Sequence, residues 1–133
     1  MVNAFRTMLP LVFTALLVAP CLAAEGQSGS KRQQYVYVLK LAPRMQEAAA
    51  RTEAENGVIG RHFARLAKAT DAGQVILAGR TTEALDKTFG LVAFEAESEE
   101  AARQFMESDP AVEASIMSAT LHPYSVALYR KMR

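Results

Sequence analysis

The sequence has no tryptophan, a single cysteine and only two histidines among 133 residues. The cysteine, Cys21, lies in an apolar N-terminal segment, and none follows it. A chain without that segment can form no internal disulfide and offers no cysteine nucleophile or thiolate metal ligand. Imidazole chemistry is therefore restricted to His62 and His122.

Motifs that mark several large enzyme classes are also absent from the sequence. It contains no glycine-rich phosphate motif and no serine or cysteine elbow of the kind that supports an acyl-enzyme mechanism. It has no H-x-x-x-H motif and no carboxylate–histidine cluster with metal-ligand spacing. We therefore expect no cofactor and no metal site.

Charge of one sign is not in excess either. The chain has 15 basic and 14 acidic residues, and 14 of each remain without Arg6. A chain with no net charge lacks the bulk electrostatic attraction on which nucleic-acid binding depends. We therefore predict that nucleic acid is not a partner.

Residues 1–24 have the pattern of a secretory signal peptide. Arg6 is the only charged residue there, an apolar run follows from 8 to 18, and small residues close the segment. Cleavage near Ala23 or Ala24 fits best. The pattern predicts a periplasmic or secreted protein that meets a membrane only transiently during export, with an uncleaved anchor as the alternative.

The rest of the chain has the length of one domain. Residues 25–34 are rich in Gly, Ser, Gln and charge, which predicts a flexible leader. A domain over residues 35–128 and a basic tail over residues 129–133 follow. Without a disulfide the core is modest, so dimerisation would bury additional surface.

Four strands are predicted from β-branched and aromatic composition. They cover residues 35–41, 74–78, 88–95 and about 115–123. The second reads as a short buried strand, and the third is apolar on both faces, which is typical of a central strand. Gly90 within the third strand indicates a bulge or a close neighbour.

Two helices are predicted from their end signals. Thr52 and Glu55 have the spacing of a capping box, and Gly73 provides a stop. Ser98 caps the second helix, and Pro110 ends it. A core stripe is predicted in the first helix at Ile59, Phe63, Leu66 and Thr70. Gly57 and Gly60 lie inside this helix and suggest that another backbone approaches it closely.

His62 and Asp109 are the candidate catalytic residues. His62 lies roughly 60° from the centre of the predicted stripe, so it is a boundary residue able to reach a cavity beside the core. Asp109 follows Phe105 by four positions and continues the buried line of the second helix. The alternatives are a histidine bonded to a backbone carbonyl and an Asp–Pro pair that caps a short turn.

The order strand, helix, strand, strand, helix, strand predicts an α+β protein. Two such βαβ units give a ferredoxin-like, four-stranded antiparallel sheet with both helices on one face. The other face would expose apolar residues such as Val36 and Val38. Sheet-to-sheet pairing of two subunits would cover them, so we predict a homodimer through the open sheet face, a dimeric α+β barrel.

Several short segments, taken in order and spacing, resemble the YCII-related family. They are His62–Leu66, Ala72–Gly79, Phe89–Phe94, Ser98–Ala102, Asp109–Val112 and Leu121–Tyr124. The resemblance runs from Tyr35 to about Leu128 and implies a ferredoxin-like dimeric barrel with a His–Asp active site, here His62 and Asp109. Many members have proline after the glycine of the second strand, where this chain has Arg80, which implies a changed pocket rim. Most members have no assigned reaction, whereas relatives are similar to muconolactone isomerases and some act on chlorinated aromatic breakdown products.

The chemistry expected of the pair is proton transfer. An imidazole exchanges protons near neutral pH, and a carboxylate on one ring nitrogen makes the other a better base. This suits an isomerase- or lyase-like step on a small cyclic, lactone-like or aromatic substrate. A non-catalytic module that binds a small ligand or only dimerises is the alternative, and the sequence leaves open whether the protein is an enzyme.

Overall fold

The predicted order of strands and helices is confirmed in the computed structural model, which describes residues 32–130. The strands are β1 (Gln33–Leu41), β2 (Val75–Arg80), β3 (Phe89–Ala96) and β4 (Met117–Pro123). The helices are α1 (Glu53–Asp71), α2 (Glu99–Glu107) and the short α3 (Pro110–Glu113), with 3-10 turns η1 (Pro43–Met45) and η2 (Ala48–Ala50). β1 begins two residues before the predicted start, inside the segment expected to be a flexible leader. The predicted signal peptide lies outside the described residues.

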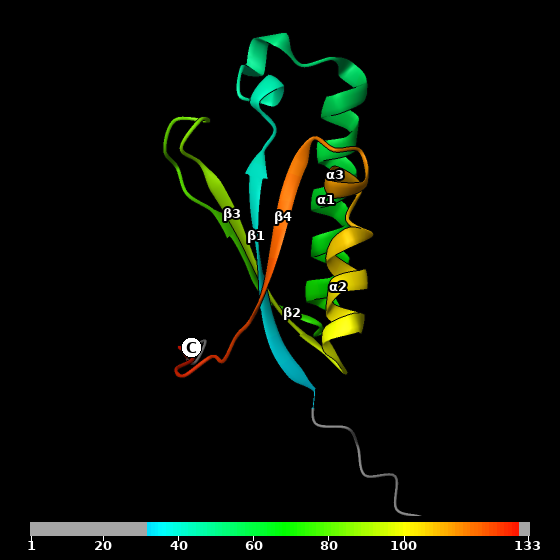
Figure 1. The fold of residues 1–133 in the computed structure, drawn as a ribbon, viewed down its shortest axis with the longest axis vertical. Coiled ribbons are helices and arrows are strands. Elements are labelled where there is room, and N and C mark those ends of the chain that lie inside the picture. Colours follow the sequence, from blue (N-terminus) through cyan, green and yellow to red (C-terminus); the bar gives the residue numbers. More distant parts are fainter. Residues whose placement is uncertain (1–31, 131–133) are drawn as a thin grey trace, which may run out of the picture.

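The four strands form one antiparallel sheet in the order β2-β3-β1-β4. The helices cover one face of this sheet (Figure 1). β3 is central, as its apolar composition predicts. This is the predicted ferredoxin-like arrangement, and it puts the side of α1 against the sheet.

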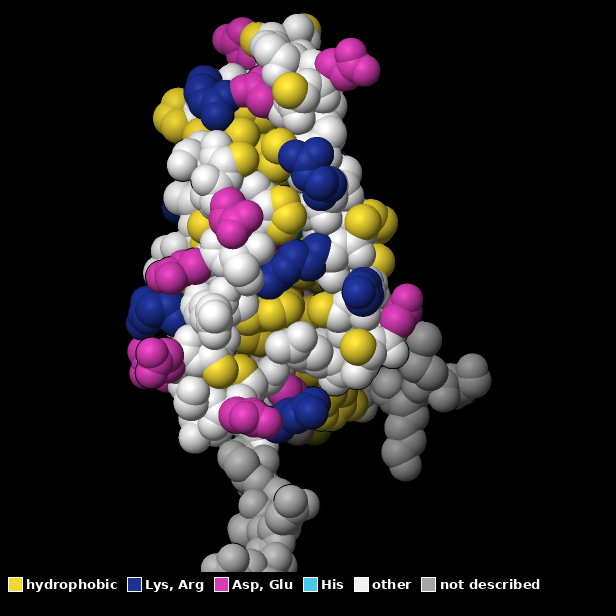
Figure 2. Space-filling model, turned by 90° about the vertical axis from the view of Figure 1, so that its right-hand side faces the viewer, with side chains coloured by type: hydrophobic (Ala, Val, Ile, Leu, Met, Phe, Trp, Pro, Cys, Tyr) yellow, Lys and Arg dark blue, Asp and Glu magenta, His cyan; other side chains and the backbone are white. Residues whose placement is uncertain are grey.

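The main core lies between the sheet and the helices. It combines inward-facing strand residues with small and flexible helix residues: Tyr35, Tyr37, Leu39, Val92, Phe94, Leu66, Ala69, Ala102 and Met106. Figure 2 shows the helix-covered side, where apolar side chains surface in strips between the helices and charges are interspersed around them. No histidine is visible among the coloured residues there, because His62 turns inward from α1.

The ends of α1 form as predicted, but its buried stripe does not. Thr52 and Glu55 make both hydrogen bonds of the capping box. Gly73 adopts a φ of +75° at the C-terminal end, which favours glycine. The expectation that Phe63 is a core residue is wrong, since it is 73% exposed. The buried line instead runs through Leu66 and Ala69, because the helix is rotated toward the side that also carries His62.

The expected close backbone approach at the helix glycines is also wrong. A Cβ added at Gly60 would meet nothing within 4 Å, and one at Gly57 would meet only the flexible end of Arg61. At Gly90 the expectation is confirmed, because a Cβ there would lie 3.3 Å from the Leu39 Cβ. Gly90 therefore permits β1 and β3 to approach at that point.

β2 differs from its prediction as a buried strand. It lies at the edge of the sheet, and only Val75 is buried, whereas Leu77 is 61% exposed. An edge strand has one neighbour, so apolar composition alone does not guarantee cover on both faces. The uncovered part of β2 forms a wall of the pocket described below.

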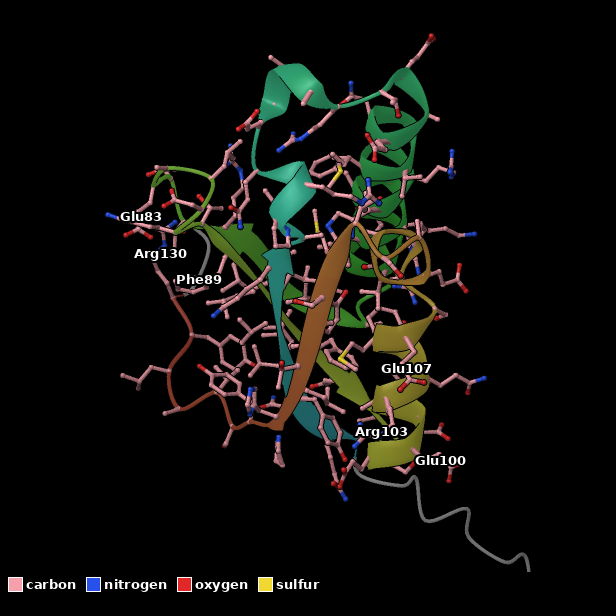
Figure 3. All side chains as sticks on the ribbon, turned by 45° about the horizontal axis from the view of Figure 1, so that its top comes forward. Glu83, Phe89, Glu100, Arg103, Glu107 and Arg130 are labelled. Atoms are coloured by element: carbon pink, nitrogen blue, oxygen red, sulfur yellow. The ribbon has the colours of Figure 1, made fainter. Side chains whose placement is uncertain are left out.

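The C-terminal segment turns onto the sheet face opposite the helices (Figure 1). The backbone N–H groups of Tyr124 and Val126 donate to Gln34, whose side chain donates to the Tyr129 hydroxyl. Arg130 of this segment and Arg103 of α2 lie on opposite sides of the sheet (Figure 3). The homodimer through this open face stays a prediction. No helix within residues 32–130 is long and apolar enough to cross a membrane.

Candidate active site

The structure brings His62 and Asp109 into direct contact, as predicted. Nδ1 of His62 lies 2.8 Å from each carboxylate oxygen of Asp109, across 47 positions of sequence. The side chain of Asp109 is fully buried, and that of His62 is 12% exposed. An ionised carboxylate only accepts hydrogen bonds, so Nδ1 carries the hydrogen and Nε2 is the ring nitrogen left for a ligand.

Asp109 also has the capping role that the sequence offered as an alternative. It is the N-cap of α3, and its Oδ1 accepts a hydrogen bond of 2.9 Å from the backbone N–H of Ala111. Pro110 occupies the first helical position, as the Asp–Pro pair predicts. The two roles coexist because the carboxylate has enough lone pairs for both partners.

Tyr37 is a further member of the site, which the sequence did not reveal. Tyr37 lies in the middle of β1, and its side chain is fully buried. Its hydroxyl donates a hydrogen bond of 3.1 Å to Oδ2 of Asp109. Burial, reinforced by the neighbouring charge of Asp109, raises the pKa of Tyr37 well above its ordinary value. The hydroxyl is therefore a permanent donor at neutral pH. Alternation marks Tyr37 as inward-facing, but it does not indicate what the hydroxyl contacts.

The surroundings of Asp109 keep it ionised. Burial alone would raise the pKa of Asp109, but hydrogen bonds from His62 and the Ala111 backbone hold that pKa below its usual range. The Tyr37 hydroxyl acts in the same direction. The imidazole of His62 therefore faces a negative charge at neutral pH.

Arg65 lies close to the carboxylate of Asp109, and no sequence pattern indicated this position. One of its nitrogens, Nη2, donates to the Phe105 carbonyl at 2.6 Å and to the Ser108 hydroxyl at 2.9 Å. The guanidinium stacks 4.2 Å above the Phe105 ring. Nη1 is buried without a hydrogen-bond partner in the described part of the chain and lies 3.8 Å from Oδ2 of Asp109. Arg65 thus ties α1 to α2 beside the His–Asp pair.

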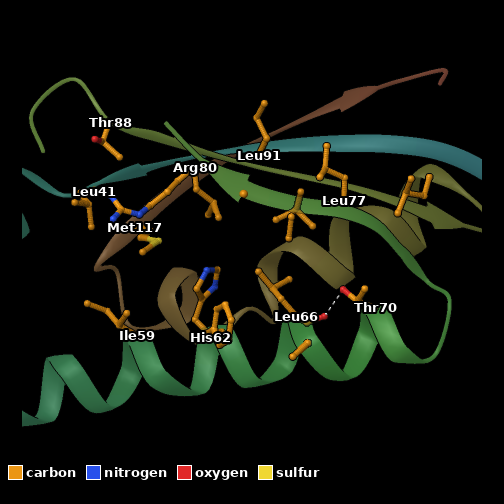
Figure 4. Close-up of a pocket in the computed structure, with 18 of the residues that line it drawn as sticks. Leu41, Ile59, His62, Leu66, Thr70, Leu77, Arg80, Thr88, Leu91 and Met117 are labelled. Atoms are coloured by element: carbon orange, nitrogen blue, oxygen red, sulfur yellow. Dashed lines mark hydrogen bonds between the residues drawn. The ribbon is translucent and has the colours of Figure 1, made fainter. Parts of the chain in front are cut away.

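A pocket of about 830 Å³ lies between α1 and the sheet, beside His62. Figure 4 shows His62 rising from α1 toward the strands, with Leu41, Met117 and Arg80 around the same space. Most of the lining is apolar: Leu39, Leu41, Ile59, Leu66, Ile76, Ala78, Leu85, Val92 and Met117 are among these residues. The candidate site is therefore an imidazole with one nitrogen anchored and its ring beside a hydrophobic cavity.

The second histidine does not belong to this site. His122 is exposed on β4 and pairs with Val36 on the open side of the sheet. Within residues 32–130, His, Asp and Glu side chains form no group of three or more that could hold a metal ion. Of the two histidines, His62 is the one that lines the pocket.

The fold and the site define a ferredoxin-like α+β protein with a buried carboxylate behind a pocket-facing histidine. The model of the YCII-related domain matches residues 34–121, and the chain belongs to this family. None of the curated proteins matches it. Among solved structures it is similar to 5-chloro-2-hydroxyhydroquinone dehydrochlorinase from Burkholderia phenoliruptrix AC1100 in complex with 2,5-dihydroxybenzoquinone, at 20% identity and a TM-score of 0.47, over 69% of this chain and 93% of that one. A likeness at this level identifies no shared activity.

Proposed function

We propose that the protein is a small-molecule enzyme in which His62 and Asp109 act as an acid–base pair. The observation that carries this proposal is the position of one imidazole between two environments. Nδ1 of His62 contacts a buried carboxylate, while the ring lines a largely apolar pocket of about 830 Å³. A histidine with a purely structural role requires no such cavity beside it.

The proposed step is proton abstraction by His62 Nε2 from an activated C–H of the substrate. The C–H electrons remain on the substrate, and Asp109 stabilises the imidazolium that forms. In an isomerisation, the same proton returns to another atom of the substrate. In an elimination, the electrons form a double bond and a leaving group departs with its own bonding pair. General acid–base catalysis of this kind contributes roughly 10²–10⁴-fold to rate.

The pocket supports a small, compact and mainly apolar substrate. Ligand pockets of this size have mostly hydrophobic walls with a few polar groups that fix orientation. Here the apolar walls come from α1 and all four strands, and His62 provides the reactive polar group. A small cyclic, aromatic or lactone-like compound fits this description. A binding module without turnover is the competing function.

The test compares His62→Ala with the matched control His122→Ala, which changes the exposed histidine on β4. Both variants are screened for turnover of small cyclic acids and lactones by NMR, with circular dichroism as the check on folding. The proposal predicts that His62→Ala folds and loses turnover, whereas His122→Ala retains it. Turnover that survives in His62→Ala removes the enzymatic role of the pair, and ligand binding without turnover in the wild type supports the binding module.

We also propose that residues 1–24 direct export and are removed, and that the mature protein pairs through its open sheet face. Apolar residues on that face support the pairing, including Val38 and the 38%-exposed Leu91. Mass spectrometry of protein recovered from the periplasm tests the cleavage near Ala23 or Ala24. Light scattering tests the dimer, which Val38→Asp is expected to convert to a monomer, and a monomeric wild type contradicts the pairing.

A further inference from the structure

Arg80 is a charged residue on the inner side of the sheet. In the strand register it pairs with Gly90, which in turn pairs with Leu39. Directly paired residues of antiparallel strands share a face, and Leu39 is 4% exposed beneath the helices. The Arg80 side chain therefore leaves β2 on the helix side, where an apolar residue would be expected.

This position puts the guanidinium into the pocket that His62 lines. Figure 4 shows Arg80 extending from the strand wall toward Leu41 and Met117, and His62 rising from the opposite wall. The charged end of Arg80 and the imidazole thus face one common cavity.

The charge of Arg80 is not neutralised locally. Among residues 32–130 it takes part in no salt bridge. Among the described lining residues Asp71 is the single acidic one, and it lies nine positions beyond His62 on α1, about 13 Å along the helix axis. A second basic residue, Arg51, also lines the pocket, held by bonds of 2.9 and 2.7 Å to the Met45 carbonyl. The described lining is therefore mostly apolar, with two arginines against one acidic side chain.

We propose that Arg80 binds a carboxylate of the substrate, so that the substrate class is small cyclic or aromatic carboxylic acids. This inference rests on the proposed function and specifies its substrate. Arg80 is exposed at the end of the edge strand β2, so a carboxylate can reach its planar guanidinium. This group donates two parallel hydrogen bonds to a carboxylate. The ring of the acid then lies along the apolar wall, with its reactive C–H toward His62.

The roles of Arg80 and His62 are separate. Arg80 contacts the part of the substrate that does not change during proton transfer, so its contribution is the same in the ground state and the transition state. Loss of such a contact raises KM and leaves kcat largely unchanged, whereas loss of the acid–base residue lowers kcat. Arg80 is a specificity-determining residue, and this division predicts different kinetic signatures for the two variants.

The test is a calorimetric titration of the mature protein with benzoate, cyclohexanecarboxylate and phenylacetate, each compared with its neutral amide. Wild-type protein is expected to bind at least one carboxylate about tenfold or more tightly than its amide. Arg80→Ala is expected to weaken carboxylate binding roughly 10- to 100-fold, because hydrogen bonds to charged groups have this magnitude. Amide binding should be unchanged. Arg80→Lys should lie between, since it keeps the charge and loses the paired donors.

The matched control is Arg103→Ala, which removes an exposed arginine of α2 that pairs with Glu99 outside the pocket. It should bind carboxylates as the wild type does. Equal affinity for acids and amides, failure of every acid to bind, or unaltered acid affinity in Arg80→Ala overturns the assignment.

Failure of this inference is distinguishable from failure of the proposed function. His62→Ala is titrated with the same ligands and assayed for turnover. If acid binding depends on Arg80 but turnover is unchanged in His62→Ala, the acid–base role is removed and the carboxylate site stands. If turnover depends on His62 but acids and amides bind equally well, the acid–base role stands and the carboxylate site is removed.

Discussion

The Tyr37 hydroxyl donates to Oδ2 of Asp109 at 3.1 Å, although 72 positions separate the two residues. This bond joins the centre of the sheet to the turn between α2 and α3. The carboxylate also receives hydrogen bonds from His62 and the Ala111 backbone. It is thus fixed from three directions before any ligand enters the pocket, and the orientation of His62 follows from it.

Tyr37→Phe removes one of these donors without changing the ring. We expect the free energy of unfolding at pH 7 to fall by about 1.5–3 kcal/mol, since the hydroxyl bonds a charged acceptor. The pKa of Tyr37 is raised on folding, so above about pH 10 the unfolded state loses its proton first and wild-type stability falls. The gap between wild type and Tyr37→Phe in urea denaturation should therefore shrink above pH 10. A gap that is absent at pH 7 or grows in alkali contradicts this role.

Asp109→Asn and Asp109→Ala separate the two roles of this residue. Asparagine still caps α3, whereas alanine does not, so we expect Asp109→Ala to be less stable than Asp109→Asn by about 1 kcal/mol. Both variants lose the negative charge opposite His62. Turnover should fall on the order of 10²-fold or more in each, as for loss of acid–base function. If Asp109→Asn keeps the turnover of the wild type and only Asp109→Ala loses it, Asp109 has a structural role alone.

Acid should weaken the fold partly through Asp109. Its pKa is lowered on folding, so its contribution to stability is complete above the ordinary carboxyl value of about 3.9 and is lost as pH falls through the folded pKa. Urea denaturation between pH 6 and pH 2.5 measures this. The wild type should lose more free energy of unfolding below about pH 4 than Asp109→Asn does. Parallel curves for the two proteins would show that this carboxylate does not contribute.

The glycines of α1 and its end should respond with opposite signs to alanine. Gly60 lies within the helix with open space around its Cβ position, so Gly60→Ala should raise the free energy of unfolding by about 1 kcal/mol. Gly73 has a φ of +75°, so Gly73→Ala should lower it by about 1–2 kcal/mol. Thermal and urea denaturation check both. Destabilisation by Gly60→Ala would contradict the open surroundings of this position.

Features that depend on a few adjacent residues were predictable from the sequence. The capping box at Thr52, the glycine end at Gly73 and the Asp109–Pro110 pair each have a local physical cause, and each forms as expected. The contact between His62 and Asp109 was expected from the family resemblance. The expectation that Asp109 continues the second helix was wrong, because α2 ends at Glu107 and Asp109 is the N-cap of α3.

Features that depend on packing between distant elements were not predictable. The spacing of apolar residues in α1 fits two neighbouring stripes on the helix surface. Only the position of the sheet decides that Leu66 is buried while Phe63 is exposed. The burial of β2 depends on what covers an edge strand. The roles of Tyr37 and Arg65 arise because three separate segments meet at one carboxylate, and no local pattern marks such a meeting.

Deuterium exchange tests the central claim most directly, because it detects proton transfer even without net conversion. Small cyclic and aromatic carboxylic acids with an activated C–H are incubated in D₂O with wild type, His62→Ala and His122→Ala, and incorporation is followed by NMR. Wild type and His122→Ala should introduce deuterium into at least one acid, and His62→Ala should do so only at the uncatalysed rate. Equal incorporation with His62→Ala, or none with the wild type, would contradict an acid–base role for His62.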